Sequence, residues 1–241
     1  MAYRATTGLT GKGLVKDQFL GERVFAVCTG PSALLLDWSL LENEYLWGCG
    51  LSIDMKEPDH FDFYSVTEQA RLPIVEPKIR HLDIPKFYNR HWEAADLHTR
   101  YKFPNDDPPP DWKETEARHV GVPTISQFGF SKNLDYVCHI PEASAISGVL
   151  QPALWLGFKE IYVIGMDLSG HYSHDAPGRI GTRNVHAIKY IADPLNQMSD
   201  ELEKNFPDVK FANLGDKNAN PALHKKFPLK MEYMTLEESL A

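Results

Sequence analysis

The sequence lacks several features that define common classes of protein. Its three cysteines, Cys28, Cys49 and Cys138, are scattered and show no CxxC spacing. Such a set favours reduced thiols in an intracellular protein over a disulfide framework or a zinc site. No apolar run approaches the ~18 residues of a membrane-spanning helix, and the polar start MAYRATTGLTGKG predicts no signal peptide. We therefore expect a cytoplasmic protein without a transmembrane segment, and we leave a peripheral membrane association open.

An excess of positive charge is also missing. Lys and Arg number 25 against 33 Asp and Glu, which gives a net charge of −8. Proteins that bind nucleic-acid backbones are usually basic, so we expect no nucleic-acid partner. A hydrophobic content of 43 % is ordinary for a globular protein. Since no internal repeat or linker interrupts the chain, we expect a single domain over residues 1–241, and a homo-oligomer is left open.

The most informative stretch is residues 147–169, SGVLQPALWLGFKEIYVIGMDLS. Apolar residues at helical spacing up to Leu156, followed by Gly157, predict a helix with a glycine stop. Residues 161–164 are almost wholly apolar and predict a central strand of a parallel sheet. Asp167 then follows the carboxyl end of that strand, where ligands bind in open α/β sheets. Asp167 is therefore a candidate binding residue, with a turn cap as the alternative.

A second stretch combines a strand, a tight turn and the start of a helix. Residues 23–29, RVFAVCT, predict the first strand, and Gly30-Pro31-Ser32 follow directly. This geometry can place backbone N–H groups against a phosphate. Ser32 is expected either to cap the helix at 33–37 or to bond a phosphate oxygen. Because neither a full G-x-G-x-x-G nor a Walker A sequence is present, a plain Gly-Pro turn is the alternative.

The remaining patterns predict a Rossmann-like α/β domain with a mostly parallel sheet flanked by helices. Residues 1–22 are polar and Gly-rich and predict an arm that either orders late or is frayed. Residues 184–206 predict a long helix, kinked at Pro194. Further strands are expected at 44–50, 61–66, 72–75, 122–128 and 209–214, and a short strand and a terminal helix at 227–240.

Residues 85–120 differ in composition from the segments on either side. They are rich in aromatic residues, His and Arg and contain the tract NDDPPP. A long irregular segment in a compact domain is usually a lid or a binding loop. We expect a lid that contacts a polar ligand such as a sugar, with a mobile surface insertion as the alternative.

Taken together, VFAVCTGPSALLLDWSLLENEYLWGCG and SGVLQPALWLGFKEIYVIGMDLS resemble a known superfamily. It holds the bacterial sialyltransferases of glycosyltransferase family 42 and the proteins of domain-of-unknown-function family 115, among them an archaeal 6-hydroxymethylpterin diphosphokinase. The resemblance implies a Rossmann-like sheet with a nucleotide or nucleotide-sugar site. Thr29 and Gly50 stand where the family has Asn. The ligand contacts that the resemblance implies are Thr29, Gly30, Pro31, Ser32, Gly50, Ser147 and Gly148.

In those sialyltransferases a His acts as general base without a metal, which points to the loop after Asp167. The candidates are His171, His174 and His186, of which we rank His186 first and His174 second, although a strict alignment puts Thr182 on the catalytic position. Tyr172 is expected to stabilise the leaving phosphate, and Arg179 and Arg183 to hold phosphate. A metal site at His171, His174 and Asp175 is disfavoured, because no supporting motif accompanies this spacing.

Three functions follow as hypotheses. The first is an inverting glycosyltransferase that needs no cofactor beyond its nucleotide-sugar donor and acts on a glycan or another hydroxyl acceptor. The second is a diphosphokinase that uses ATP and Mg²⁺, with Asp54, Asp167 and Asp216 as candidate carboxylates. The third is a non-catalytic nucleotide-binding protein. A dehydrogenase fits poorly, because the third glycine of the dinucleotide fingerprint is absent.

Overall fold

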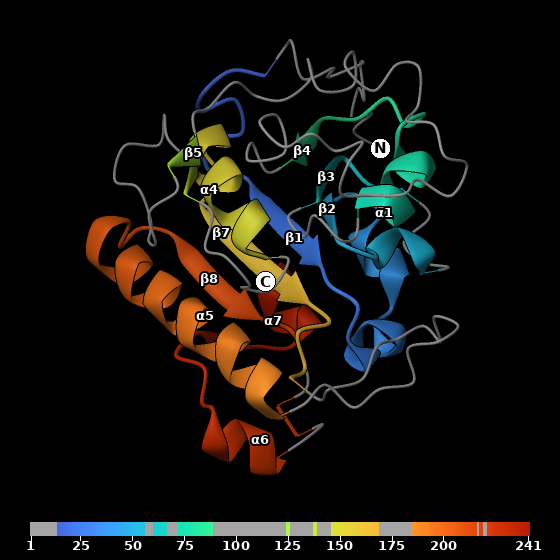
Figure 1. Cartoon of the computed structure of the whole chain (residues 1–241). Helices are drawn as coiled ribbons and strands as arrows, with labels where there is room; N and C mark the ends of the chain where they lie inside the picture. Colours follow the sequence, from blue (N-terminus) through green and yellow to red (C-terminus); the bar gives the residue numbers. More distant parts are fainter. Residues whose placement is uncertain are drawn as a thin grey trace.

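Seven parallel strands form the central sheet of the computed structural model, in the order β4-β3-β2-β1-β7-β8-β9 (Figure 1). The structure describes residues 14–55, 60–66, 72–88, 124–125, 137–138, 146–168, 185–215, 217–218 and 221–241. The predicted Rossmann-like α/β class is confirmed. The strands are β1 Arg23–Val27, β2 Tyr45–Cys49, β3 Phe63–Val66, β4 Lys86–Tyr88, β7 Glu160–Ile164, β8 Lys210–Asn213 and β9 Glu232–Tyr233, with a separate pair of β5 Thr124–Ile125 and β6 Val137–Cys138.

Helices cover both faces of the sheet and give three layers (Figure 1). Side chains of α4 and α5 share one apolar cluster, and those of α1, α7 and the 3₁₀ turns share the other. No helix in the described ranges is long and apolar enough to cross a bilayer. The helices are α1 Leu72–Ile79, α4 Ser147–Leu156, α5 Val185–Asn205, α6 Pro221–Lys226 and α7 Leu236–Leu240, with 3₁₀ turns η2 Pro31–Leu35, η3 Trp38–Leu41 and η4 Ser52–Asp54.

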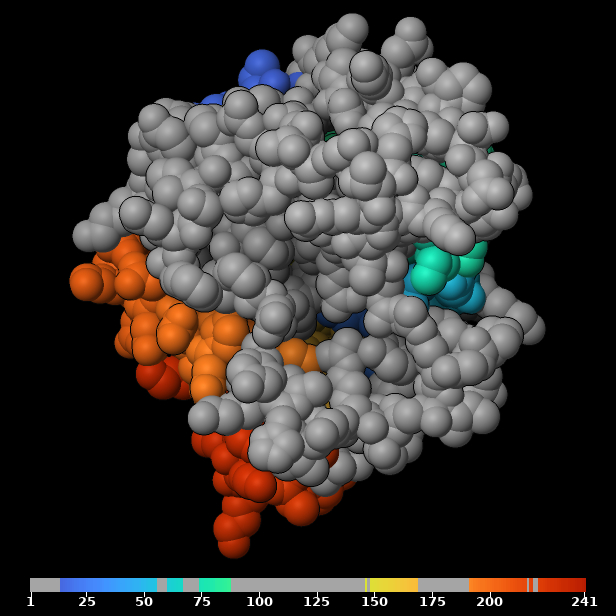
Figure 2. Space-filling view, viewed as in Figure 1, coloured from blue at the N-terminus to red at the C-terminus, as the bar shows by residue number. Residues whose placement is uncertain are grey.

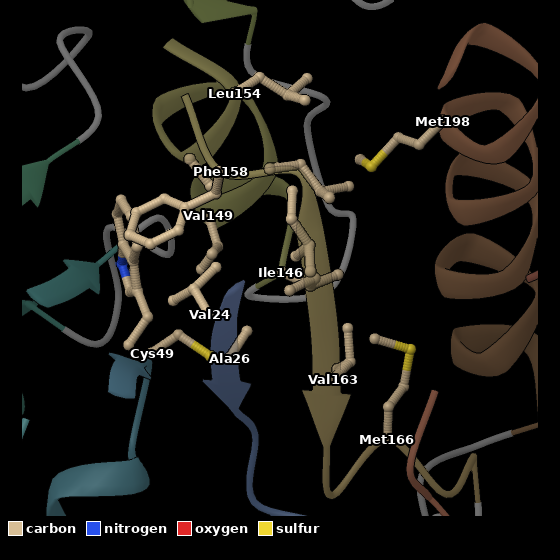
Figure 3. Close-up of a cluster of buried hydrophobic side chains, with 14 of the residues drawn as sticks. Val24, Ala26, Cys49, Ile146, Val149, Leu154, Phe158, Val163, Met166 and Met198 are labelled. Atoms are coloured by element: carbon tan, nitrogen blue, oxygen red, sulfur yellow. The ribbon is translucent and has the colours of Figure 1, made fainter. Parts of the chain in front are cut away.

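The strands alternate between the two clusters with the period of two that a pleated strand imposes. Val24 and Ala26 of β1 face α4 and α5, whereas Phe25 and Val27 face the opposite layer. Figure 3 shows Val24 and Ala26 beneath Val149 of α4. The outward side of α5 lies on the molecular surface, drawn in orange in Figure 2. An amphipathic helix on an apolar sheet face thus forms the larger core.

The chain before β1 is packed from residue 14 onward, so the prediction of a frayed arm is wrong for residues 14–22; residues 1–13 lie outside the described part. Phe19 is 6 % exposed and stacks on Phe158, with ring centroids 5.1 Å apart. Asp17, Phe19 and Gly21 donate their N–H groups to the carbonyls of Trp155, Leu156 and Gly157 at 3.0, 2.7 and 3.1 Å. These carbonyls lie at the end of α4, where helices leave acceptors unpaired. The arm therefore caps α4.

One predicted strand is a helix. Residues 72–75 begin α1, in which Val75 and Ile79 are fully buried one turn apart. A short apolar run such as LPIV fits a strand or a helix equally well, so periodicity could not separate the two. The fourth strand of the sheet is β4 instead, at the start of the segment 85–120 predicted as a lid. The rest of that lid lies outside the described residues.

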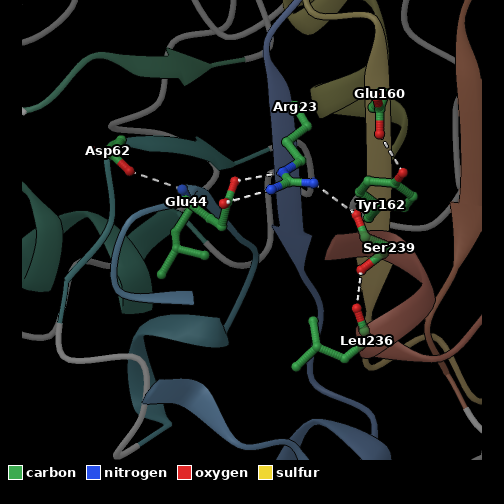
Figure 4. A network of polar contacts seen from close by, with 8 residues as sticks. Arg23, Glu44, Asp62, Glu160, Tyr162, Leu236 and Ser239 are labelled. Carbon is green, nitrogen blue, oxygen red and sulfur yellow. Dashed lines mark hydrogen bonds and ion pairs between the residues drawn. The ribbon is translucent and has the colours of Figure 1, made fainter. Parts of the chain in front are cut away.

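A polar network closes the amino end of the sheet (Figure 4). Arg23 makes two hydrogen bonds to the Glu44 carboxylate, at 2.9 and 3.1 Å, and donates to the Ser239 carbonyl at 3.0 Å. The guanidinium fork fits a carboxylate in this two-bonded way. Arg23 thereby ties β1 to the start of β2 and to α7, at the end of the sheet opposite the loops described next.

Candidate functional site

The order of the strands reverses between β1 and β7. From β1 the chain proceeds outward through β2, β3 and β4, then returns to β7 on the other side of β1 and continues to β8 and β9. The loops after β1 and β7 therefore lead away from each other at the carboxyl edge. Ligands of open α/β sheets bind at such a switch point. Gly30, Pro31 and Ser32 follow β1 here, and Asp167 follows β7.

The two loops touch through glycines. Gly30 donates its N–H to the carbonyl of Gly165 at 2.8 Å. A Cβ at Gly30 would lie 2.3 Å from that carbonyl oxygen and 2.6 Å from Oδ2 of Asp167. Gly165 has a φ of 71°, in the left-handed region that glycine adopts freely. Side chains at either position would push the loops apart, so the close contact depends on both glycines.

Asp167 anchors the loop after β1. Its Oδ2 accepts the backbone N–H of Ser32 at 2.7 Å, and its Oδ1 accepts the Ser32 hydroxyl. Asp167 is 2 % exposed, so a charge-assisted pair of bonds offsets the burial of the carboxylate. The expected Ser32 helix cap is wrong, because no side chain caps η2. A direct contact of Asp167 with a ligand stays a prediction.

A second layer of polar residues holds the backbone of the β7 loop. Asn213 donates Nδ2 to the Met166 carbonyl at 2.9 Å, and His224 Nε2 lies 3.0 Å from the Asp167 carbonyl. A carbonyl only accepts, so Nε2 carries the proton and Nδ1 accepts the Tyr233 hydroxyl at 3.1 Å. No sequence motif marks His224 or Tyr233, so neither residue was predicted.

Burial raises the pKa of Tyr233 to about 12, and the negative charge of Asp167 adds to the effect, while a hydrogen bond to Asn213 opposes it. Burial is the larger cause, because a charged phenolate loses its hydration there, and the buried carboxylate of Asp167 makes a second negative charge nearby less favourable still. Tyr233 therefore stays neutral and keeps its proton available for His224 throughout the physiological pH range.

The other predicted ligand contacts lie along the same edge. Gly50, with a φ of 59°, donates its N–H to the Ser65 carbonyl at 3.1 Å. The Ser65 hydroxyl donates to the Gly148 carbonyl at 2.9 Å, which joins β3 to the first turn of α4. Cys28, before the loop after β1, and Cys49, at the end of β2, contact each other through their sulfurs, which lie 3.6 Å apart. We call Gly30, Ser32, Gly50, Gly148 and Asp167 the strand-end cluster.

The amino end of α4 supplies the electrostatic component of this edge. The N-cap residue Ile146 makes no side-chain capping bond. The first N–H groups of a helix have no partner within the helix, and the helix dipole places partial positive charge there. Gly148 in this turn is fixed to Ser65 of the sheet, so the helix start is directed at the strand ends. Such a position is favourable for an anion, phosphate above all.

Several predicted residues lie outside the described part of the chain, and their roles stay predictions: His171, His174, Tyr172, Arg179, Arg183 and Asp216. His186 lies in the first turn of α5 and Ser147 begins α4, although the side chains of both lie outside it as well. Thr29 lies in the loop after β1, Pro31 begins η2, and Asp54 in η4 forms an ion pair with Lys78. Among the residues described, no three His, Cys, Asp or Glu gather as a metal site would require.

Comparisons with known proteins give one structural likeness. No protein-family model matches the chain, and no curated protein matches it. A crystal structure of a variant of the sialyltransferase CST-II in complex with CMP is similar to this chain at 15 % sequence identity. The likeness covers 87 % of this chain and 86 % of the sialyltransferase, with a TM-score of 0.44.

Proposed function

We propose that the protein is a nucleotide-sugar-dependent glycosyltransferase of the sialyltransferase type. It transfers a sugar, with inversion and without a metal, to a hydroxyl group in the synthesis of a glycan or surface polysaccharide. The observation that carries this proposal is the strand-end cluster, which gathers Gly30, Ser32, Gly50, Gly148 and Asp167 at the switch point of a parallel sheet. The sequence resemblance implies nucleotide contacts at Gly30, Ser32, Gly50 and Gly148, and Asp167 is the acid expected after the central strand.

The cluster suits the phosphate of a nucleotide. Gly30, Gly50 and Gly148 carry no side chain that would keep a phosphate away. Because the N–H groups of Gly30, Ser32 and Gly50 already have partners within the protein, the phosphate is assigned to the start of α4. The uncapped start of α4 adds partial positive charge at the same edge. Thr29, next to Gly30, contributes a hydroxyl that can donate and accept hydrogen bonds to the ribose or the base.

The proposed reaction is a single displacement. The acceptor oxygen attacks the anomeric carbon of the donor sugar, and the bond from that carbon to the phosphate oxygen breaks, so that its electrons leave with the nucleotide. His186, or His174 in second place, takes the proton of the acceptor hydroxyl, a transfer suited to an imidazole near neutral pH. Tyr172, Arg179 and Arg183 are assigned to the charge on the departing phosphate.

Thermal unfolding with CMP, CDP, UDP, GDP and ATP, each with Mg²⁺ or EDTA, tests the nucleotide site. A ligand at 100 times its dissociation constant adds about 2.7 kcal/mol of stability, which raises the melting temperature measurably. We expect stabilisation by CMP or CDP that EDTA leaves unchanged. Stabilisation by ATP and Mg²⁺ alone would favour the diphosphokinase instead. No response to any nucleotide would refute the proposal.

A pair of variants locates the binding. Gly30→Ala places a Cβ against Gly165 and Asp167, so it should abolish the CMP response. Arg23→Ala breaks the network at the opposite end of the sheet, and it should lower the melting temperature yet keep the response. Equal responses to CMP in the two variants would place the nucleotide elsewhere.

The role of His186 is tested separately from binding. We expect His186→Asn to lose sugar transfer by a factor of about 10²–10⁴, the usual contribution of a general base, while CMP still stabilises the protein. The matched control is His81→Asn, because His81 is an exposed histidine just after α1; this variant should transfer sugar normally. Normal transfer by His186→Asn would move the assignment to His174. A protein that binds CMP but transfers no sugar from any donor would be the non-catalytic nucleotide-binding protein.

A further inference from the structure

We propose that Cys28 and Cys49 form a reversible disulfide that regulates the nucleotide site; the regulatory part rests on the function proposed above. The register of β1 and β2 brings the two residues together. Val24 pairs with Tyr45 and Ala26 with Trp47, so Cys28 lies opposite Cys49 two residues further on. Both sulfurs point to the face covered by α4, 3.6 Å apart, and both residues are free thiols.

The backbone positions suit a disulfide. Neighbouring strands lie ~4.8 Å apart, within the span of about 4.4–6.8 Å that disulfides bridge between Cα atoms. The sulfurs must approach from 3.6 Å to a bond length of about 2.0 Å. The hydrogen bond that the Cys49 thiol donates to the Val27 carbonyl, at 3.0 Å, is lost in the process.

The two thiols differ in access, which assigns their roles. Cys28 is partly exposed, whereas Cys49 is 1 % exposed in the core beside Ala26 (Figure 3). The neighbouring Cys28 thiol and burial raise the pKa of Cys49 well above its ordinary value. An oxidant therefore meets Cys28 first, and Cys49 acts as the resolving thiol.

The chemistry balances with a peroxide as oxidant. The Cys28 sulfur attacks a peroxide oxygen, the O–O bond breaks, and a sulfenic acid and water form. The Cys49 sulfur then attacks the Cys28 sulfur, its proton leaves with the displaced hydroxyl as a second water, and the S–S bond forms. Two thiols and one hydrogen peroxide thus yield one disulfide and two waters, and a reducing thiol reverses the reaction by exchange.

The disulfide would act on the strand-end cluster directly. Cys28 precedes Thr29 and Gly30, and Cys49 precedes Gly50, so the new bond joins the starts of two loops assigned to the nucleotide. The loop after β1 has little freedom to adjust, because Gly30 is packed against Gly165 with no space for a further atom. We therefore expect the oxidised protein to bind nucleotide more weakly than the reduced protein.

The test uses the full chain carrying Cys138→Ser, so that Cys28 and Cys49 are its remaining cysteines. After treatment with hydrogen peroxide, mass spectrometry of a non-reducing digest should show peptides of Cys28 and Cys49 joined, with the loss of two hydrogens. Dithiothreitol should separate them. A digest in which Cys28 is overoxidised, or both thiols stay free, overturns the disulfide. Cys49→Ser is the matched control and should accumulate the Cys28 sulfenic acid, trapped by dimedone.

Regulation is measured on the same samples. The apparent affinity for CMP, obtained from the rise in melting temperature at increasing CMP concentrations, should fall at least tenfold on oxidation. Dithiothreitol should restore it. Cys49→Ser should respond to CMP before and after peroxide alike. A disulfide that leaves CMP binding unchanged overturns the regulatory role. Failure of the reduced protein to bind CMP would refute the proposed function and with it the regulatory role, while the linked peptides would still report on the disulfide.

Discussion

A single buried carboxylate, Asp167, joins the loops that follow β1 and β7. It binds Ser32 through the backbone N–H and the hydroxyl, and its own carbonyl is held by His224. A related Asp–Ser pair lies in an exposed place, where Oδ1 of Asp37, the N-cap residue of η3, accepts both the N–H and the hydroxyl of Ser39, at 3.1 and 2.6 Å. The two pairs differ in burial, and Asp167 uses both carboxylate oxygens where Asp37 uses one.

We expect Asp167→Asn to lower the free energy of unfolding by about 1.5–3 kcal/mol, because an amide removes the charge and one of the two acceptors that Ser32 needs. Asp37→Asn should change it by less than about 0.5 kcal/mol, since Asn serves nearly as well as Asp at an exposed N-cap. Urea unfolding of both variants measures the difference. Equal losses would mean that the Asp167–Ser32 bonds gain nothing from burial or from the second carboxylate oxygen.

Tyr233 makes the stability of the fold depend on pH in the alkaline range. Its pKa is raised from 10.0 to about 12 in the folded protein, so folding favours the neutral phenol. That contribution is complete below the ordinary pKa and is lost as the pH rises from 10.0 toward about 12. Tyr233→Phe should therefore lose stability less steeply than the unmodified protein over this interval.

Denaturant unfolding at a series of alkaline pH values measures that slope. Burial also raises the pKa values of Tyr64 and Tyr162, but both residues are present in the two proteins being compared. The difference between the slopes thus belongs to Tyr233. Parallel stability curves above pH 10.0 would show that its ionisation is not coupled to folding.

At the scale of elements, the arm at residues 14–22 caps the end of α4 and packs against Phe158 just beyond it. The arm donates N–H groups to the last carbonyls of α4, and Phe19 fills the space between Phe63 and Phe158, with ring centroids 5.4 and 5.1 Å away. Gly157 ends the helix in the left-handed conformation, as predicted, and directs the chain into β7. Each of these contacts orients α4, whose opposite end lies at the strand-end cluster.

Phe19→Ala should cost about 3–5 kcal/mol of unfolding free energy, the usual loss for a buried aromatic side chain. Leu20→Ala is the matched control, because Leu20 is the next residue and is 66 % exposed. Its cost should stay within about 0.5 kcal/mol. Thermal or urea unfolding separates the two variants. A small loss for Phe19→Ala would mean that the arm is not part of the folded core.

The sequence predicts where most strands lie, but not which side chains from distant segments contact each other. The strands β1, β2 and β7 follow from largely apolar runs, which buried strands of parallel sheets require, and β3 and β8 follow from β-rich segments that polar residues interrupt. Residues 72–75 were misassigned because four apolar residues carry no period. Asp167 was recognised as a strand-end acid, but its bond to Ser32, far away in the sequence, depends on the β1–β7 pairing. His224 and Tyr233 were missed for the same reason.

At the scale of the whole molecule, the strand order decides where a site can form. The central pairing of β1 with β7 brings Gly30 against Gly165, and β8 and β9 then place Asn213 and Tyr233 behind Asp167. Composition and periodicity predicted the α/β class, since they report on burial. They could not assign the candidate base histidines to a position, because loop conformation depends on contacts that no local pattern encodes.

The arm that caps α4 is synthesised well before α4 itself, and this order matters during translation. Phe19 and β1 emerge from the ribosome long before Phe158, α4 and β7, their partners in the finished sheet. Until those residues are synthesised, one edge of β1 is unpaired and Phe19 lacks Phe158, the ring on which it stacks. Such edges promote aggregation and attract chaperones. A nascent chain stalled before α4 should therefore contain no folded half-domain, bind chaperones and be cleaved readily by proteases.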